Sequence, residues 1–318
     1  MVALAPKHLP AWQPFVASQQ LSAPQPSMTL ASVGLLSGQP ITATLTLAPA
    51  GSGLTFVWSD GLTLPATLAH IIDTRRGTTL GLADPATGKV RPLAIVEHYL
   101  AATCLAQLDD ITLTLPASAT ELPLLDGSAW VWYQALLTLR QAAGMPPPLL
   151  NPSLTHTLTH ALSLANVTAL PPQEGVSLSL TPCPTGFKGS YTLNYPDTPA
   201  LNGTTGHWQV GNDPNLLVAS QTFGHVAELP ALQAKGYALG VSAENTLGLL
   251  DNGEFTRPLR HASEPHLHKL LDFMGDFRLT GINPLNVAMQ VQAVAAGHST
   301  HIALAQHAVQ THALRPLP

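Results

Sequence analysis

The stretch with the clearest potential for chemistry is HLHKLLDFMGD, residues 266–276. On a helix, residues four apart lie on one face, so His268, Asp272 and Asp276 would point the same way. An imidazole and a carboxylate one turn apart suit two ligands of a zinc ion. We prefer His268 to His266, because the residue one turn beyond His266 is an apolar leucine. Since the spacing also fits an ordinary hydrogen-bonded helical pair, a metal site needs further ligands from elsewhere.

Further candidate groups lie in two other segments. Glu97 and His98 interrupt the otherwise apolar stretch 93–106, where charged groups are costly to bury without partners. His298 follows Gly297 at the start of the last predicted helix. The alternatives are a satisfied core histidine for His98 and a surface cap for His298. Two histidines and one carboxylate leave a fourth zinc position for water, which is the catalytic arrangement. A neighbouring carboxylate is then placed to deprotonate that water, and another histidine to protonate a leaving group.

The composition limits the class of protein. The chain has 318 residues, with 13 Lys and Arg against 18 Asp and Glu, and no basic cluster. A nucleic-acid groove needs clustered basic side chains, so we expect no nucleic-acid partner. The two cysteines, Cys104 and Cys183, lie far apart and predict neither a disulfide framework nor a thiolate zinc site. There are 14 histidines, one more than Lys and Arg together.

The N-terminal sequence lacks a basic segment followed by an unbroken apolar one, so we expect no signal peptide. We find no run of about 18 apolar residues and therefore expect no transmembrane segment. These features favour a cytoplasmic protein, which we expect to be a monomer.

The chain divides into two halves. Residues 1–27 are rich in Pro, Gln and Ser and are expected to form a flexible arm. A first domain is expected at 28–145, a proline-rich linker at 146–152, and a second domain at 153–311. Predicted helices are 93–106, 128–144, 226–235, 264–274 and 299–311. Predicted strands are 41–49, 54–60, 109–116, 154–165, 175–182 and 286–294. Because helix–strand–helix closes both halves, we expect α+β architecture: two duplicated domains, each packing helices on a mostly antiparallel sheet.

Four segments carry a resemblance to a known family: VEHYLAA (96–102), LPLLDGSA (122–129), HLHKLLDFMGDFRLTG (266–281) and GHSTH (297–301). They resemble the zinc-dependent UDP-3-O-acyl-N-acetylglucosamine deacetylases of lipid A biosynthesis. Supporting segments occur in the family's order from about residue 28 to 307: SVGLLSGQPITATLTLAPA (32–50), TRRGTTLG (74–81), SQTFGHVAELPALQAKG (220–236) and GVSAENT (240–246).

The resemblance implies hydrolysis of the N-acetyl group of a UDP-linked, 3-O-acylated glucosamine at an active site between the domains. It also implies a role for each candidate residue. The implied Zn²⁺ ligands are His98, His268 and Asp272. The implied catalytic groups are Glu97 as general base, His298 as general acid, Asp276 as the group that orients His298, and Thr222 as an oxyanion donor. Lys269 and Phe223 correspond to substrate-contacting positions, and residues 222–250 to an insert that forms an acyl-chain passage.

The sequence also departs from the family pattern. Leu36 stands where the family has a histidine, and Gln221 where it has an arginine. The segment after the first catalytic helix, AQLDDI (106–111), differs as well. No proposed ligand, base or acid is lost. Two alternatives remain: a paralogous zinc amidohydrolase acting on another acylated amino-sugar, and a non-catalytic descendant that binds a nucleotide-sugar or a lipid.

Overall fold

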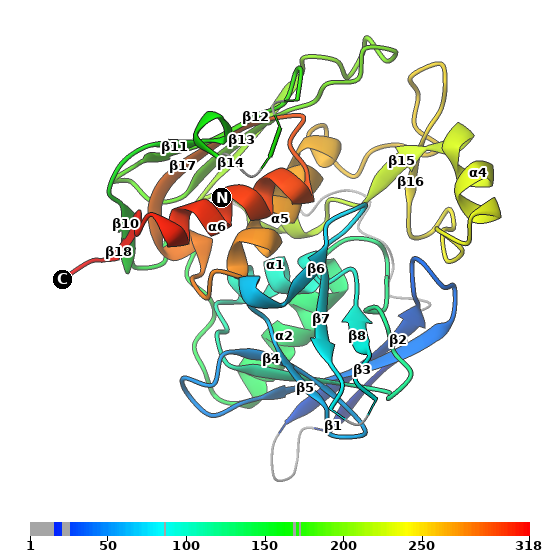
Figure 1. The fold of residues 1–318 in the computed structure, drawn as a ribbon, viewed down its shortest axis with the longest axis vertical. Helices are drawn as coiled ribbons and strands as arrows, with labels where there is room; N and C mark the ends of the chain where they lie inside the picture. The colour runs from blue at the N-terminus through cyan, green and yellow to red at the C-terminus, as the bar shows by residue number, and fades with distance from the viewer. Residues whose placement is uncertain (1–15, 21–25, 86, 168–169, 172) are drawn as a thin grey trace.

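The computed structural model describes residues 16–20, 26–85, 87–167, 170–171 and 173–318. Two main sheets lie on either side of a helical layer that contains α1 and α5 (Figure 1). A smaller lobe carrying α4 projects beside them. The helices are α1 (Glu97–Ala106), α2 (Trp130–Ala142), α3 (Pro214–Val218), α4 (Leu229–Ala234), α5 (Glu264–Arg278) and α6 (His298–Gln310). Short 3₁₀ turns occupy Leu68–His70, Leu164–Asn166, Val226–Glu228 and Pro284–Asn286.

The first sheet is built from the first half of the chain. Its order is β1 (Val16–Gln20), β2 (Ser27–Val33), β3 (Pro40–Leu47), β9 (Ile111–Leu115), β4 (Leu54–Trp58) and β5 (Thr63–Pro65). Buried and less buried residues alternate along β4 and β9, as expected for strands with one face on a core. The pairing is antiparallel except between β4 and β9, which run parallel.

The second sheet comes from the second half. It runs β11 (Leu162–Ser163), β12 (Ser177–Pro182), β17 (Val287–Val294), β10 (His156–Leu158) and β18 (Leu314–Pro316). β13 (Lys188–Thr192) also pairs with β17, in parallel, and β14 (Thr205–Gln209) pairs with β13. Two small sheets complete the fold: β6 (Ile71–Asp73), β7 (Thr79–Ala83) and β8 (Val90–Leu93), and β15 (Phe223–His225) with β16 (Leu247–Leu249).

The expected α+β class is confirmed, and some predicted boundaries are corrected. The predicted helix 93–106 begins only at Glu97, because β8 extends to Leu93 and Ile95 has a positive φ of 60°. The predicted strand 154–165 is two short strands. Within the expected arm 1–27, residues 16–20 form β1, whose backbone pairs with β2; residues 1–15 and 21–25 lie outside the described part. The division into domains stays a prediction.

The two halves of the chain meet where α1 packs on α5. Every residue of α1 is buried, and so is nearly all of α5. Gly275 makes this approach possible, since a Cβ there would overlap the backbone carbonyl of Glu97. The pair of helices therefore fixes the candidate residues of the first half against those of the second.

We expect Gly275→Ala to destabilise the protein. Alanine favours a helix over glycine by about 1 kcal/mol. The overlap with the Glu97 carbonyl outweighs that gain, because overpacking costs typically about 1–3 kcal/mol. Denaturant unfolding measures the change, with Gly224→Ala as control, where a Cβ meets nothing within 4 Å. Equal stability of the Gly275 variant and the unmodified chain would contradict this packing.

No helix in the part of the chain that the structure describes is both long and apolar enough to cross a membrane.

Candidate active site

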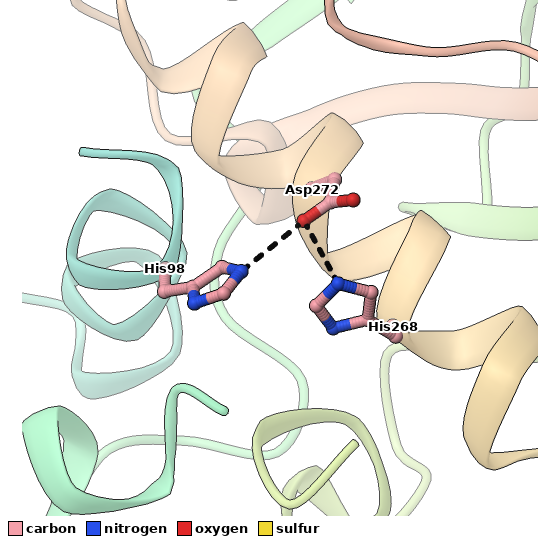
Figure 2. Close-up of side chains that lie close together, drawn as sticks. All are labelled: His98, His268 and Asp272. Carbon is pink, nitrogen blue, oxygen red and sulfur yellow. Dashed lines mark ion pairs between the residues drawn. The ribbon is translucent and has the colours of Figure 1, made fainter. Parts of the chain in front are cut away.

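Three candidate metal ligands converge between α1 and α5. His98 comes from α1, and His268 and Asp272 come from successive turns of α5 (Figure 2). Asp272 Oδ1 lies 3.5 Å from His98 Nε2 and 3.6 Å from His268 Nε2. All three side chains are buried, and one ligand atom from each lies within 4.8 Å of the others. The grouping makes these residues a candidate metal-binding site.

The chemistry of these groups fits a cation. Burial lowers the pKa of His268 to about 3, so its imidazole is neutral and has a free lone pair. Its Nδ1 lies 3.2 Å from the Ser220 carbonyl, which fixes Nδ1 as the donor and leaves Nε2 facing Asp272. Asp272 Oδ1 is buried without a hydrogen-bond partner. Because an unpaired buried carboxylate oxygen is costly, a metal ion between these atoms explains the arrangement.

His266, the rejected alternative on α5, points elsewhere. Its Nε2 lies 2.9 Å from the hydroxyl of Thr204. A Cβ on Gly206 would meet its side chain, so the ring packs against β14. The geometry therefore favours His268 over His266 as a ligand.

Glu97, the candidate base, begins α1 at the edge of the ligand set. Its side chain is buried, and burial raises its pKa. Oε2 accepts a hydrogen bond of 3.0 Å from the backbone N–H of Thr78. Oε1 lies 3.9 Å from His298 Nε2. A carboxylate held on one oxygen and free on the other is arranged to take a proton.

His298 and Asp276 form a second pair. His298 Nδ1 donates to Asp276 Oδ2 at 2.9 Å, which directs Nε2 toward Glu97 and Asp272. Burial opposes the charge of His298, but the attraction of Asp276 and this hydrogen bond outweigh it and raise the pKa to about 10. His298 is therefore held in its protonated form and placed to give a proton from Nε2.

A second imidazole shares the same carboxylate oxygen. His301 Nδ1 donates to Asp276 Oδ2 at 2.8 Å, and its ring packs edge-on to Phe273. Asp276, His298 and His301 form a second cluster of potential metal ligands. Here hydrogen bonds already join the groups, so we describe the cluster as a network that holds His298.

The expected substrate-contacting residues lie beside the ligand set. Lys269 Nζ donates to Asp272 Oδ2 at 3.1 Å and lies 5.6 Å from the centre of the Phe223 ring. Burial opposes the charge of Lys269, but Asp272 raises its pKa, so the side chain stays cationic. The backbone of Thr222 pairs with Gly127 and Leu247, which fixes its position at the cavity wall.

A cavity of about 500 Å³ opens from the ligand set toward the α4 lobe. Its lining includes the candidate metal ligands and proton-transfer groups, and also Arg76 and Glu228. The far wall is mainly apolar and is formed by residues from the expected insert and from the first half: Leu35, Leu36, Val226, Leu229, Leu232, Tyr237, Ala238 and Val241. The cavity thus joins a polar reaction site to an apolar passage.

Leu36 and Gln221, the two single-residue departures from the family pattern, both have defined contacts in the structure. Leu36 lines the apolar wall, while its backbone N–H donates to Glu121 Oε2 at 2.7 Å. Gln221 is fully buried, and its amide nitrogen donates to two backbone carbonyls. Its Oε1 accepts a hydrogen bond from Arg257, so a guanidinium from another loop lies at this position.

Sequence reasoning missed three groups that hold the site: Thr78, Ser220 and His301. Thr78 and Ser220 act partly through backbone atoms, which leave no signal in residue type. His301 could have been found, since it lies three residues, about one helical turn, beyond His298 within the GHSTH motif.

A buried set of two histidines and one aspartate, flanked by a carboxylate and a second His–Asp pair, is the arrangement of a metal-dependent hydrolase. The chain belongs to the UDP-3-O-acyl N-acetylglycosamine deacetylase (LpxC) family, which matches residues 24–310. This finding confirms the resemblance seen in the sequence motifs.

Curated relatives match over most of their length, and each is named UDP-3-O-acyl-N-acetylglucosamine deacetylase. The protein from Leptospira biflexa is 29% identical over 295 residues, covering 89% of this chain and 87% of the relative. The protein from Nostoc sp. is 32% identical over 283 residues, covering 86% and 92%. The protein from Chlamydia caviae is 31% identical over 278 residues, covering 86% and 90%.

Proposed function

We propose that this protein hydrolyses the N-acetyl group of UDP-3-O-acyl-N-acetylglucosamine, releasing acetate, in lipid A biosynthesis. The observation that carries the proposal is the convergence of His98, His268 and Asp272 beside Glu97 and His298. Family membership supports the same reaction. The donor set of two imidazoles and one carboxylate favours Zn²⁺ as the metal.

The residues divide the chemistry between them. When bound, Zn²⁺ would polarise the acetyl carbonyl and lower the pKa of a water. Glu97 takes a proton from the attacking water at Oε1, the carboxylate oxygen that faces His298. The Thr222 hydroxyl donates to the carbonyl oxygen as negative charge develops there. His298 gives a proton from Nε2 to the departing amine, and Asp276 keeps His298 charged and oriented.

The rest of the cavity accounts for the other parts of the substrate. The cationic Lys269, close to the Phe223 ring, is suited to the nucleotide phosphates. The apolar wall around Leu229 and Leu232 is suited to the acyl chain. Because one chain supplies every proposed group, we propose a monomer as the active form; its place in the cytoplasm stays a prediction.

Acetate release from UDP-3-O-(hydroxyacyl)-N-acetylglucosamine tests the proposal. We expect turnover that a chelator abolishes and added Zn²⁺ restores. Absence of turnover with about one zinc bound per chain would favour a paralogue that cleaves another amide. Absence of both turnover and zinc would favour the binding-protein alternative.

A further inference from the structure

We propose that Thr78 is a positioning residue that holds the candidate base and the partner of the candidate acid in one fixed arrangement. This inference rests on the proposed function, since it concerns the same proton transfers. Thr78 lies on the loop between β6 and β7, and its side chain is fully buried. It lies in the TRRGTTLG segment (74–81) that supports the family resemblance, but no role is assigned to it from the sequence alone.

Thr78 contacts both carboxylates at once. Its backbone N–H donates to Glu97 Oε2 at 3.0 Å, at the start of α1. Its hydroxyl donates to Asp276 Oδ1, near the end of α5. These two carboxylates come from different halves of the chain, and a third element joins them through one residue. A shift of this loop would therefore move both groups together.

The hydroxyl contact determines what Asp276 can do with its other oxygen. With Oδ1 held by Thr78, Oδ2 receives the Nδ1–H groups of His298 and His301, at 2.9 and 2.8 Å. Without the Thr78 hydroxyl, the Asp276 carboxylate could rotate, and the two Nδ1–H groups would then divide differently between its oxygens. The Thr78 hydroxyl oxygen also lies 3.4 Å from His298 Nδ1. Thr78 thus helps to aim His298 Nε2 at the reacting atoms without touching them.

The local backbone is shaped for this contact. Gly77 has a φ of 151°, in a region that side chains rarely adopt. A Cβ there would lie 2.7 Å from Ile95 Cδ1 and 3.1 Å from Glu97 Oε1. Only glycine lets the loop come close enough to present the Thr78 N–H to Glu97. The RRGTT segment therefore combines close approach at residue 77 with two hydrogen bonds at residue 78.

The test compares three variants of the full chain in steady-state kinetics with the substrate above. Thr78→Val keeps the shape and the backbone N–H but removes the hydroxyl, whereas Thr78→Ser keeps the hydroxyl. Thr79→Val makes the same chemical change at the next residue, a half-buried position in β7 that is not among the described residues lining the cavity. Zinc content per chain and thermal stability are measured for each.

We expect Thr78→Val to lower kcat about 10- to 100-fold, the range found when a group that orients a metal-site residue is removed. KM and zinc content should stay unchanged, because Thr78 is not among the described residues that line the cavity or form the candidate ligand group. Thr78→Ser should recover kcat to within about threefold, and Thr79→Val should keep the original value. Unchanged kcat in Thr78→Val, or equal losses in the valine and serine variants, would overturn the proposal. A loss confined to zinc binding or KM would also overturn it.

Crystal structures of the same variants separate this proposal from the proposed function. If the unmodified protein shows no turnover, the deacetylase assignment fails, and the side-chain geometry decides the role of Thr78. A rotated Asp276 carboxylate and a displaced His298 ring in Thr78→Val, with both unmoved in Thr79→Val, support positioning. An Asp276–His298 pair that stays in place in Thr78→Val overturns it.

Discussion

Replacing His268 with alanine should remove the metal and the activity together. The His268 imidazole is neutral, its Nδ1 is held by the Ser220 carbonyl, and its Nε2 faces the unpaired oxygen of Asp272. Because loss of an orienting contact alone costs about 10- to 100-fold in metal affinity, loss of the ligand itself should cost more than about 100-fold. Metal analysis after dialysis, together with acetate release, measures both effects.

His266 provides the matched control on the same helix. It lies two residues earlier and is also a buried histidine, but its Nε2 contacts the Thr204 hydroxyl. We expect His266→Ala to reduce stability while zinc stays bound. A His268→Ala protein that keeps its zinc and its turnover would refute the ligand assignment. Loss of zinc in His266→Ala alone would move the ligand to that position.

Much of the candidate site could be predicted because helix periodicity places residues in three dimensions. The i, i+4 spacing put His268, Asp272 and Asp276 on one face of a helix, and α5 spans all three. His98 in an apolar segment and His298 after a glycine were candidates from their sequence context, and the family motifs implied their roles; they lie on α1 and α6. The structure places all five residues around one centre; their individual roles remain predictions.

The parts that could not be predicted depend on contacts between distant segments. Thr78 contributes a backbone N–H, which every residue except proline has. The residue types therefore do not reveal that Gly77 lets this loop come close to Glu97. α1 begins four residues later than the apolar pattern predicts, because a residue such as Leu93 suits a buried helix and a buried strand end equally. The Arg257 guanidinium beside Gln221 comes from a loop that lies 36 residues further along the chain. Sequence spacing carries no signal for such a contact.

Replacing His298 with alanine should depress kcat while leaving the bound metal unchanged. His298 lies 4.0 Å from the nearest oxygen of Asp272 and is not part of the ligand group of His98, His268 and Asp272. General acid catalysis contributes typically about 10²- to 10⁴-fold, so we expect a loss of kcat in that range. Single-turnover acetate release measures the expected loss of rate, and zinc analysis measures whether the bound metal is unchanged. Unaltered turnover with full zinc content would eliminate the role.

Asp276→Asn tests the role of the His298 proton through the pH dependence of kcat. Burial lowers the pKa of His298, and Asp276 contributes most to raising it to about 10, ahead of Glu97 and Asp272, so an amide at position 276 should lower that pKa. A group that acts in its protonated form loses activity as pH rises through its pKa. The alkaline limb of the kcat profile should therefore move to lower pH in Asp276→Asn and vanish from the residual activity of His298→Ala. An alkaline limb that stays in place in both variants would assign that titration to another group, and His298 would then serve only to position the substrate.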